Sequence, residues 1–327
     1  MARRFGEFEL VAQIFAPLAR DAHGAFGLTD DVALLVPKPG EEIVLKTDSL
    51  VEGVHFRRDD PPATVGQKAL RRALSDLAAK GAAPVAYLLA IALPEWIDTG
   101  WLEEFARGLS RDQTELGVSL HGGETNATPG PLTITVTAVG ALPAGMLIRR
   151  IGAEPGDTVF VTGTIGDAGA GLAMLAGRTA AIAGAERDFL ISRYRRPSPR
   201  LALGLALRGI AHASIDVSDG LVADLGHVAD VSDVRIEIDS AAIPLSDALR
   251  QCCGAEREAR ILAATAGDDY EIAFTAPPGA ESPIRAFGQK TGTGVTPIGR
   301  VVKGRGTVLL DETGLEIPLE RRGYTHF

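Results

Sequence analysis

Residues 44–56 read VLKTDSLVEGVHF, an apolar run that turns polar within three residues. The run that ends at Leu45 is typical of a strand inside a buried sheet. Lys46, Thr47 and Asp48 follow it directly. A carboxylate at the point where a strand leaves the core needs a partner, because a buried and uncompensated charge is costly. The stretch therefore predicts a sheet whose strand delivers a ligand to a site.

The composition is that of a globular protein long enough for two domains with cores of their own. The chain has 327 residues, of which 46% are hydrophobic and 23% charged. Its formal net charge is -9 and its pI is about 5.3, which argues against non-specific binding of nucleic acid, because a phosphate backbone attracts a basic surface. No apolar stretch approaches the roughly 20 residues of a membrane span. We therefore expect neither nucleic acid nor membrane among the partners.

The N-terminal segment and the cysteines both bear on the cellular compartment of the protein. Residues 1–20, MARRFGEFELVAQIFAPLAR, contain acidic residues within the apolar pattern, which predicts an amphipathic helix rather than a signal peptide. Cys252 and Cys253 are adjacent, and neighbouring cysteines pair only with strain. Free thiols in a reducing cytoplasm are the expected state.

Strand and helix signals alternate along the chain and predict two domains. In the first half, 43–47, 85–93 and 132–140 are rich in strand formers, and 64–80 and 99–116 have helical periodicity, with Thr64 as a candidate N-cap and Gly81 as a stop. A Gly- and Pro-rich junction follows at 142–157. The second half has strands at 158–163, 214–217 and 271–276 and helices near 168–176 and 221–229. We predict an α/β (α+β) fold with domains 1–145 and 146–327, each a sheet with helices packed on it.

Acidic residues gather in short clusters beside small or apolar residues. The clusters contain Asp30 and Asp31, Asp48, Asp76, Glu124, Asp216 and Asp219, and Asp268 and Asp269. Each alone is explained by a turn or a helix cap. Asp76 is harder to explain in that way, because it borders the apolar stripe of its helix, where a buried aspartate needs a partner.

Taken together, the clusters predict a cation site. Two carboxylates about 4 Å apart repel by roughly 4 kcal/mol at an effective dielectric constant of about 20. If the clusters converge, divalent ions must complete the site, and a donor set made only of oxygen favours Mg²⁺ or Mn²⁺ over Zn²⁺. Because Mg²⁺ in proteins usually accompanies phosphates, nucleotide chemistry is indicated.

The common nucleotide-binding motifs are absent from the sequence. There is no P-loop, no dinucleotide fingerprint with its downstream acid, and no protein-kinase motif set. GTIGDAGAG at 163–171 is best explained by a tight turn and close helix packing. HGGE at 121–124 has two interpretations, a backbone approach to a phosphate or a plain turn.

Several longer motifs resemble those of thiamine-monophosphate kinases. They are GLTDDVALL, KTDSLVEGVHF, ALSDLAAKGA, HGGETN, IDVSDGLVADLGHVA, AGDDYEIAF and the closing RRGYTHF, in the family's order and over nearly the whole chain. The wider superfamily includes aminoimidazole ribonucleotide synthetase, selenophosphate synthetase and a hydrogenase-maturation protein. The resemblance implies a homodimer in which N-terminal sheets form a barrel.

The resemblance also implies a reaction and roles for residues. ATP would donate its γ-phosphoryl group to thiamine monophosphate, with several Mg²⁺ ions as cofactors. The implied metal ligands are Asp31, Thr47, Asp48, Asp76, Glu124, Asp216 and Asp219, of which Asp48, Asp76 and Asp219 would carry catalysis. The implied nucleotide contacts are Gly123, Arg150 and Ser218. The implied contacts to the thiamine substrate are His55, Asp268 and Tyr324.

Three positions depart from the family pattern. Thr29 stands where a glycine is usual, Glu124 replaces an aspartate, and Asp268 replaces a glutamate. The last two keep the carboxylate and change its reach by one methylene group, so they affect geometry at the metal and substrate positions. Without the resemblance, Arg150 is interpreted as a solvated loop arginine, His55 as a core histidine, and Lys46 and Lys80 as solvated lysines.

The implied acceptor is a phosphate monoester, whose second pKa is about 6. As a dianion it needs no general base, so direct in-line transfer without a phospho-enzyme is expected. Two alternatives stay open at this point. One is another ATP-dependent enzyme of the superfamily, resembling aminoimidazole ribonucleotide synthetase. The other is a nucleotide-binding regulator without catalysis.

Overall fold

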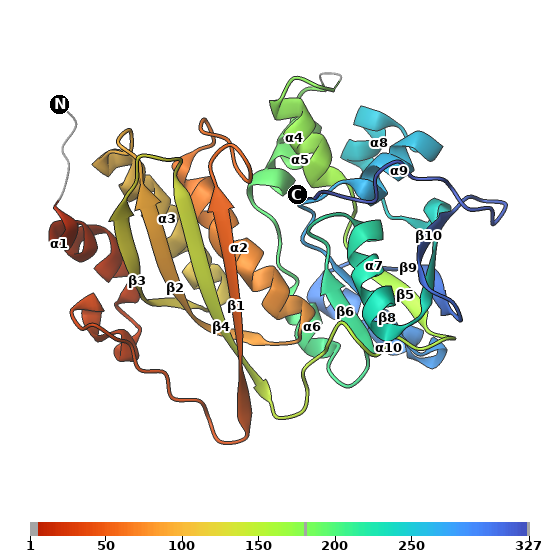
Figure 1. The fold of residues 1–327 in the computed structure, drawn as a ribbon, viewed down its shortest axis with the longest axis horizontal. Coiled ribbons are helices and arrows are strands. Elements are labelled where there is room, and N and C mark those ends of the chain that lie inside the picture. The colour runs from red at the N-terminus through yellow and green to blue at the C-terminus, as the bar shows by residue number, and fades with distance from the viewer. Residues whose placement is uncertain (1–5, 180–181, 326–327) are drawn as a thin grey trace. The chain divides into compact units, whose positions relative to one another are not determined.

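The computed structural model describes residues 6–179 and 182–325, which belong to two compact units (Figure 1). The first unit comprises Met1–Leu77 and Ala82–Gly145, and the second comprises Ala78–Gly81 and Met146–Phe327. Each unit has one sheet with helices packed on it, which confirms the predicted mixed α/β fold with two domains.

The first sheet has four strands, in the order β1-β4-β2-β3. They are β1 (Glu41–Val51), β2 (Ala83–Leu93), β3 (Ser119–Ala127) and β4 (Thr133–Pro143). Strand β4 is antiparallel to both β1 and β2, whereas β2 and β3 are parallel. The order leaves β1 and β3 at the two edges. HGGE lies inside β3, so the interpretation of these residues as a turn is wrong.

Helices α2 (Pro62–Ala79) and α3 (Thr99–Leu116) cover one face of this sheet (Figure 1). Leu74 of α2 and Phe105 of α3 are fully buried in one core with Leu50 of β1 and Val136 of β4. The other face is more polar, because the alternation of a strand turns the next residues outward. On it, the hydroxyls of Thr47 and Thr137 lie 2.9 Å apart.

The ends of these helices follow local chemistry. Helix α2 begins at Pro62, a residue whose fixed φ suits the first turn. Thr64 therefore lies inside the helix, where its hydroxyl donates to the carbonyl of Pro61, and its prediction as the N-cap is wrong. Gly81, with φ +67°, follows the end of α2 as predicted. Helix α3 is capped by Asp98, whose carboxylate accepts the Trp101 N–H at 2.8 Å.

The N-terminal segment differs from the single amphipathic helix that we predicted. Its first five residues lie outside the described part. A short α1 (Glu7–Leu10) continues into a π-helical turn (Val11–Phe15) and 3₁₀ turns at Ala16–Ala19 and His23–Leu28. Pro17 explains the break, since proline has no N–H to donate and its ring clashes with the preceding turn.

The second unit has a mixed sheet of six strands in the order β10-β7-β9-β5-β8-β6. They are β5 (Thr158–Thr162), β6 (Ala213–Asp216), β7 (Arg235–Asp239), β8 (Ile272–Ala276), β9 (Val295–Val302) and β10 (Gly306–Leu310). The β7–β10 pair is parallel, and the other pairs are antiparallel.

The helices of the second unit are α4 (Asp167–Leu175), α5 (Ala185–Arg195), α6 (Leu201–Ala206), α7 (Leu221–Ser232), α8 (Asp247–Cys253), α9 (Arg257–Thr265) and α10 (Glu281–Thr291). The helix predicted near 221–229 is α7, whose apolar residues Leu221, Leu225 and Val228 are all buried. Cys252 and Cys253 are free thiols, as expected. No helix in the described ranges combines the length and apolarity needed to cross a membrane.

Candidate active site

Two aspartates of the first unit face two cations across the contact between β1 and α2. Lys46 Nζ of β1 lies 2.8 Å from Asp76 Oδ2 of α2, and Arg72 Nε of α2 lies 3.3 Å from Asp48 Oδ2 of β1. The two carboxylate side chains are only 17% and 19% exposed. We call these four residues the ionic quartet. Lys46 is thus not the solvated lysine that we expected, and Asp76 has the partner that its position requires.

The quartet follows from residue spacing. Lys46 and Asp48 are two apart on a strand and so point to the same face, while Arg72 and Asp76 are four apart on a helix and so lie on one side. The lysine of the strand therefore pairs with the aspartate of the helix, and the arginine of the helix pairs with the aspartate of the strand. The spacing of these charges in the sequence is therefore a signal from which the ion pairs could have been inferred.

Asp31 and Glu124 lie in a different place in the first unit. Both line a cleft of about 610 Å³ on the sheet face away from α2 and α3, together with Asp30, His121 and Thr137. Thr137 shares its hydroxyl contact with Thr47. The cleft therefore brings together Asp31 and Glu124 and reaches the neighbour of Thr47.

The strand register separates this cleft from the ionic quartet. Asp48 is paired with Val136, and both side chains point to the face that the helices cover. Glu124 is in register with Ala90 of β2 and Thr135 of β4, whose side chains point to the open face. Strands β1 and β3 are opposite edges of the sheet, about 14 Å apart at the usual inter-strand spacing. Within a single copy of the chain, Asp48 and Glu124 therefore do not share an ion.

Gly123 and His55 are the other candidates in the first unit. A Cβ on Gly123 would lie 1.8 Å from the carbonyl oxygen of Leu89, so the close approach of β2 already requires glycine here. His55 is half-buried, and its Nδ1 accepts the N–H of Val51 at 3.0 Å. The neutral ring then carries its proton on Nε2.

In the second unit, Asp216 is the last residue of β6, and Ser218 and Asp219 lie in the loop between β6 and α7. The loop is shaped by Asp224, in the first turn of α7, which is 2% exposed. One oxygen of Asp224 accepts the N–H groups of Ser218, Asp219 and Gly220, at 2.9, 3.0 and 3.1 Å. The sequence reasoning missed Asp224, although an aspartate in the first turn of a helix is a known partner for such amides.

The loop is rich in negative charge. Burial, followed by the charges of Asp216 and Asp219, raises the pKa of Asp224 to about 8, even though the backbone donors act in the opposite direction. Carboxylate oxygens of Asp219 and Asp224 and a ring nitrogen of His227 lie within 4.8 Å of one another. A cation would relieve this repulsion, so the loop fits the divalent ion that the sequence predicts. The aspartate oxygens suit Mg²⁺.

Two further segments are fixed to the same loop by backbone hydrogen bonds. The N–H of Asp268 donates to the carbonyl of Ser218, and the N–H of Tyr324 donates to the carbonyl of Asp219, both at 2.8 Å. The side chain of Tyr324 is 46% exposed. The structure therefore brings together Asp216, Ser218, Asp219, Asp268 and Tyr324. Arg150 is exposed on the segment before β5.

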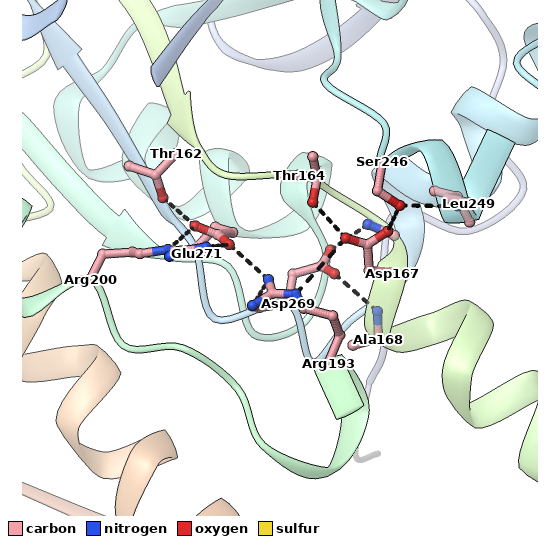
Figure 2. A network of polar contacts seen from close by, with 11 residues as sticks. Thr162, Thr164, Asp167, Ala168, Arg193, Arg200, Ser246, Leu249, Asp269 and Glu271 are labelled. Carbon is pink, nitrogen blue, oxygen red and sulfur yellow. Dashed lines mark hydrogen bonds and ion pairs between the residues drawn. The ribbon is translucent and has the colours of Figure 1, made fainter. Parts of the chain in front are cut away.

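A buried ionic network contains Asp269 and Glu271, which follow Asp268 in the chain (Figure 2). Glu271 is fully buried and accepts from Arg193 at 2.7 Å and from Arg200 at 2.5 and 2.7 Å. Asp269, also fully buried, accepts the N–H of Gly166 at 2.8 Å in the glycine-rich turn before α4. This turn thus receives a carboxylate of its own chain, in accord with its interpretation as a tight turn against a helix.

Lys80, the other lysine expected to be solvated, donates to the carbonyl of Ser214.

Comparison with known proteins places this geometry in a family. Residues 29–142 match the family model described as AIR synthase related protein, N-terminal domain, and residues 154–312 match the corresponding C-terminal domain. The chain is 40% identical over 323 residues to the thiamine-monophosphate kinase of Caulobacter vibrioides, with 98% of this chain and 90% of the relative covered.

Two solved structures agree. The thiamine-monophosphate kinase of Stenotrophomonas maltophilia K279a is 38% identical, with a TM-score of 0.84 over 94% of this chain and 98% of the other. The structure described as AaThiL complexed with AMPPCP and TMP is 34% identical, with a TM-score of 0.79 over 100% of both chains. On this likeness over nearly its whole length, the protein belongs to the thiamine-monophosphate kinases, within the AIR synthase-related proteins.

Proposed function

We propose that this protein transfers the γ-phosphoryl group of ATP to thiamine monophosphate and so forms thiamine diphosphate. The relatives at 40% identity are thiamine-monophosphate kinases, and a structure alike over the full length of both chains holds AMPPCP, an ATP analogue, and TMP. The observation in this chain that carries the proposal is the anionic loop of Asp216 and Asp219, whose crowded carboxylates call for a cation beside the candidate substrate residues Asp268 and Tyr324.

The reaction needs positioning more than it needs proton transfer. An oxygen of the monophosphate forms a bond to the γ-phosphorus, and the bond from that phosphorus to the β–γ bridging oxygen breaks. The attacking oxygen belongs to a dianion near neutral pH, because the second pKa of a phosphate monoester is about 6. No general base is therefore required, and direct transfer without a phospho-enzyme suffices.

The proposed metal ligands are Asp31, Thr47, Asp48, Asp76 and Glu124 in the first unit and Asp216 and Asp219 in the second. Mg²⁺, when bound to these oxygens, supplies positive charge that offsets the repulsion between the two phosphate-bearing substrates. In the first unit, Lys46 and Arg72 lie next to Asp76 and Asp48, so Mg²⁺ must compete with them for these carboxylates.

The proposed substrate contacts divide by chemistry. Gly123, Arg150 and Ser218 serve the nucleotide, with Arg150 exposed and able to meet polyphosphate charge. His55, Asp268 and Tyr324 serve the thiamine moiety. The exposed ring of Tyr324 can stack on an aromatic heterocycle, and the Asp268 carboxylate can accept from an amino group or attract a cationic ring.

We propose further that the protein acts as a homodimer in the cytoplasm. Leu45, 69% exposed, and Leu88, 39% exposed, lie on the sheet face opposite to α2 and α3, and such exposed apolar groups favour a protein partner. The free thiols fit a reducing compartment. Light scattering of the wild type and of Leu45→Asp tests the dimer, which the substitution should weaken.

The function is tested by ATP turnover with a set of acceptors. Thiamine monophosphate, thiamine and an aminoimidazole ribonucleotide precursor are each supplied with ATP, with Mg²⁺ or with EDTA. We expect ADP and thiamine diphosphate in equal amounts from the monophosphate alone, and only with Mg²⁺. Turnover of the aminoimidazole precursor, or binding of ATP without turnover of any acceptor, would overturn the proposal.

A further inference from the structure

Asp268 lies in a turn whose backbone is strained. Its φ is +69°, and that of Tyr270, two residues on, is +51°. Side-chain-bearing residues rarely adopt this left-handed region, and they stay there only where the surroundings hold them. The turn thus needs an explanation that its own sequence does not provide.

Part of the explanation is the neighbouring loop. Asp268 donates its N–H to the carbonyl of Ser218, and Tyr270 donates its N–H to the carbonyl of Val217, both at 2.8 Å. The turn therefore runs beside the segment that carries Asp216 and Asp219. Gly267 is also in close contact, since a Cβ there would lie 2.5 Å from the carbonyl oxygen of Ser218. These contacts fix the backbone but leave the direction of the Asp268 side chain open.

The buried ionic network holds Asp269, the middle residue of the turn (Figure 2). Asp269 receives the N–H groups of Gly166 at 2.8 Å and of Ala168 at 3.4 Å. Arg193 donates to the carbonyl of Asp269 at 3.1 Å and also to Glu271 at 2.7 Å. Both the side chain and the backbone of Asp269 are thus bound in the core, which prevents the turn from relaxing.

Tyr270 acts on the Asp268 side chain itself. Its ring is 2% exposed, so packing fixes the place of its hydroxyl, and that hydroxyl donates to Asp268 Oδ1 at 2.9 Å. Asp268 is half-buried and so remains open to solvent on another side. The buried Tyr270 hydroxyl therefore orients one oxygen of the Asp268 carboxylate, and the solvent-exposed side of the carboxylate is available to a ligand.

We propose that Tyr270 and Asp269 are positioning residues that hold the Asp268 carboxylate in place for the thiamine moiety of the substrate. This inference rests on the proposed function, in which Asp268 contacts that moiety. Tyr270 orients the carboxylate by its hydrogen bond, and Asp269 maintains the strained backbone on which both neighbours depend. A merely structural role for the two residues would affect stability and would treat both substrates alike.

The first test is Tyr270→Phe, which removes one hydroxyl and keeps the packed ring. We expect the KM for thiamine monophosphate to rise about tenfold, as for a lost hydrogen bond to a charged group, with the KM for ATP and the melting temperature unchanged. Tyr87→Phe is the matched control. Tyr87 is fully buried in the first unit, and among the described residues its hydroxyl has no hydrogen-bond partner. An unchanged KM for thiamine monophosphate in Tyr270→Phe would overturn the inference.

The second test separates this inference from the proposed function. Asp268→Asn should raise the KM for thiamine monophosphate, and adding Tyr270→Phe to it should have little further effect, because Tyr270 acts through Asp268. If Asp268→Asn alone leaves that KM unchanged, the substrate role of Asp268 fails. If Asp268→Asn raises the KM and the two changes multiply independently, the positioning role fails instead.

A third pair of variants tests Asp269 by conservative rescue. Asp269→Asn keeps an oxygen that can accept from Gly166, whereas Asp269→Ala removes it. We expect Asp269→Asn to retain a KM for thiamine monophosphate within about threefold of wild type, and Asp269→Ala to raise it by more than tenfold if it folds. Equal effects of the two variants on both substrates would contradict a positioning role, and Tyr270→Phe decides the matter if Asp269→Ala does not fold.

Discussion

Asp48 and Asp76 in the first unit each lie within ion-pair distance of a basic side chain, whereas Asp224 in the second is held by three backbone amides. In the ionic quartet the formal charges cancel, two carboxylates against one lysine and one arginine. In the loop of Asp216 and Asp219 a third carboxylate is present, and burial, followed by the charges of Asp216 and Asp219, raises the pKa of Asp224 to about 8.

This difference shows that the two acidic regions have different charge balances before a divalent cation binds. The second-unit loop is preorganised by its backbone hydrogen bonds, and the charges of Asp216 and Asp219 act against that of Asp224. A cation that binds there relieves an electrostatic repulsion that is already present. In the first unit, a cation must compete with Lys46 and Arg72 for the same oxygens. Removing a basic side chain of the ionic quartet should therefore strengthen the binding of a divalent cation, whereas removing a proposed ligand in either region should weaken it.

The largest expected effect comes from removing a proposed ligand in either region. Asp48→Asn and Asp219→Asn should each lower kcat by about 10³-fold or more, since a neutral amide holds the Mg²⁺ that offsets phosphate repulsion far less tightly than a carboxylate does. Asp48→Asn should also cost about 1–2 kcal/mol of stability, because it leaves the largely buried Arg72 without this anionic partner. Coupled ADP-release kinetics and thermal melting measure the two quantities.

A double variant separates stability from catalysis in this case. Asp48→Asn combined with Arg72→Met should melt closer to wild type than Asp48→Asn alone, while its activity stays lost. A near-normal rate in Asp48→Asn would contradict the metal role of this residue.

The next effect concerns the support of the second-unit loop. Asp224→Ala leaves three amides of 218–220 without their acceptor, and we expect a loss of about 3 kcal/mol of stability and about 10²-fold in kcat. Asp224→Asn keeps an acceptor oxygen and should recover most of the stability. Chemical denaturation and kinetics of both variants provide the comparison. Equal stability of wild type and Asp224→Ala would show that the loop is held in another way.

A smaller effect of opposite sign is expected for Lys46→Met. Without the lysine, the Asp76 carboxylate is available to a cation, so the Mg²⁺ concentration at half-saturation should fall about three- to tenfold, an energy comparable with an ion pair near the surface. Calorimetric titration of Mg²⁺ measures this without catalysis. Lys38→Met, at an exposed lysine of the same unit, is the control. A weaker affinity for Mg²⁺ in Lys46→Met would mean that the lysine does not compete with the ion.

The contrast between the regions also shows what a sequence reveals. The helix at 99–116 was predicted to the residue from its periodicity, and in the structure Asp98 and Gly117 cap its two ends. The N-terminal segment was not, since Pro17 breaks a pattern that otherwise looks helical. Local signals of this kind predicted β1, β2 and β4 in the first sheet and β5, β6 and β8 in the second. They did not predict β3, β7, β9 or β10.

The candidate site was less predictable, because it depends on strand register. Asp48 and Glu124 looked equivalent in the sequence, and only the order β1-β4-β2-β3 shows that they lie at opposite edges and on opposite faces. Asp224 was passed over because its partners are backbone amides, which no residue pattern displays. The network of Glu271 and Arg193 joins residues 78 positions apart, a pairing that a single sequence does not specify.

The smallest expected effect is a pH dependence confined to the second unit. The buried network contains three carboxylates, Asp167, Asp269 and Glu271, against two guanidinium groups, Arg193 and Arg200 (Figure 2). One negative charge is therefore in excess, and burial, acting first, raises the pKa of Asp167 above 3.8 and that of Asp269 well above it. The folded protein thus keeps a proton that the unfolded chain releases above the ordinary aspartate value.

The sign of the effect follows from this linkage. A carboxyl whose pKa is higher in the folded state stabilises most at low pH, and that stability is lost as the pH rises through the folded value. We expect the melting temperature to fall by about 3 °C as the pH rises from the ordinary aspartate value towards pH 8, and Asp269→Asn, which cannot titrate, to have a flatter profile. Scanning calorimetry in buffers of low ionization enthalpy measures both curves. A melting temperature that rises over this interval, or equal slopes in the two proteins, would mean that the excess charge is neutralised by something other than a retained proton.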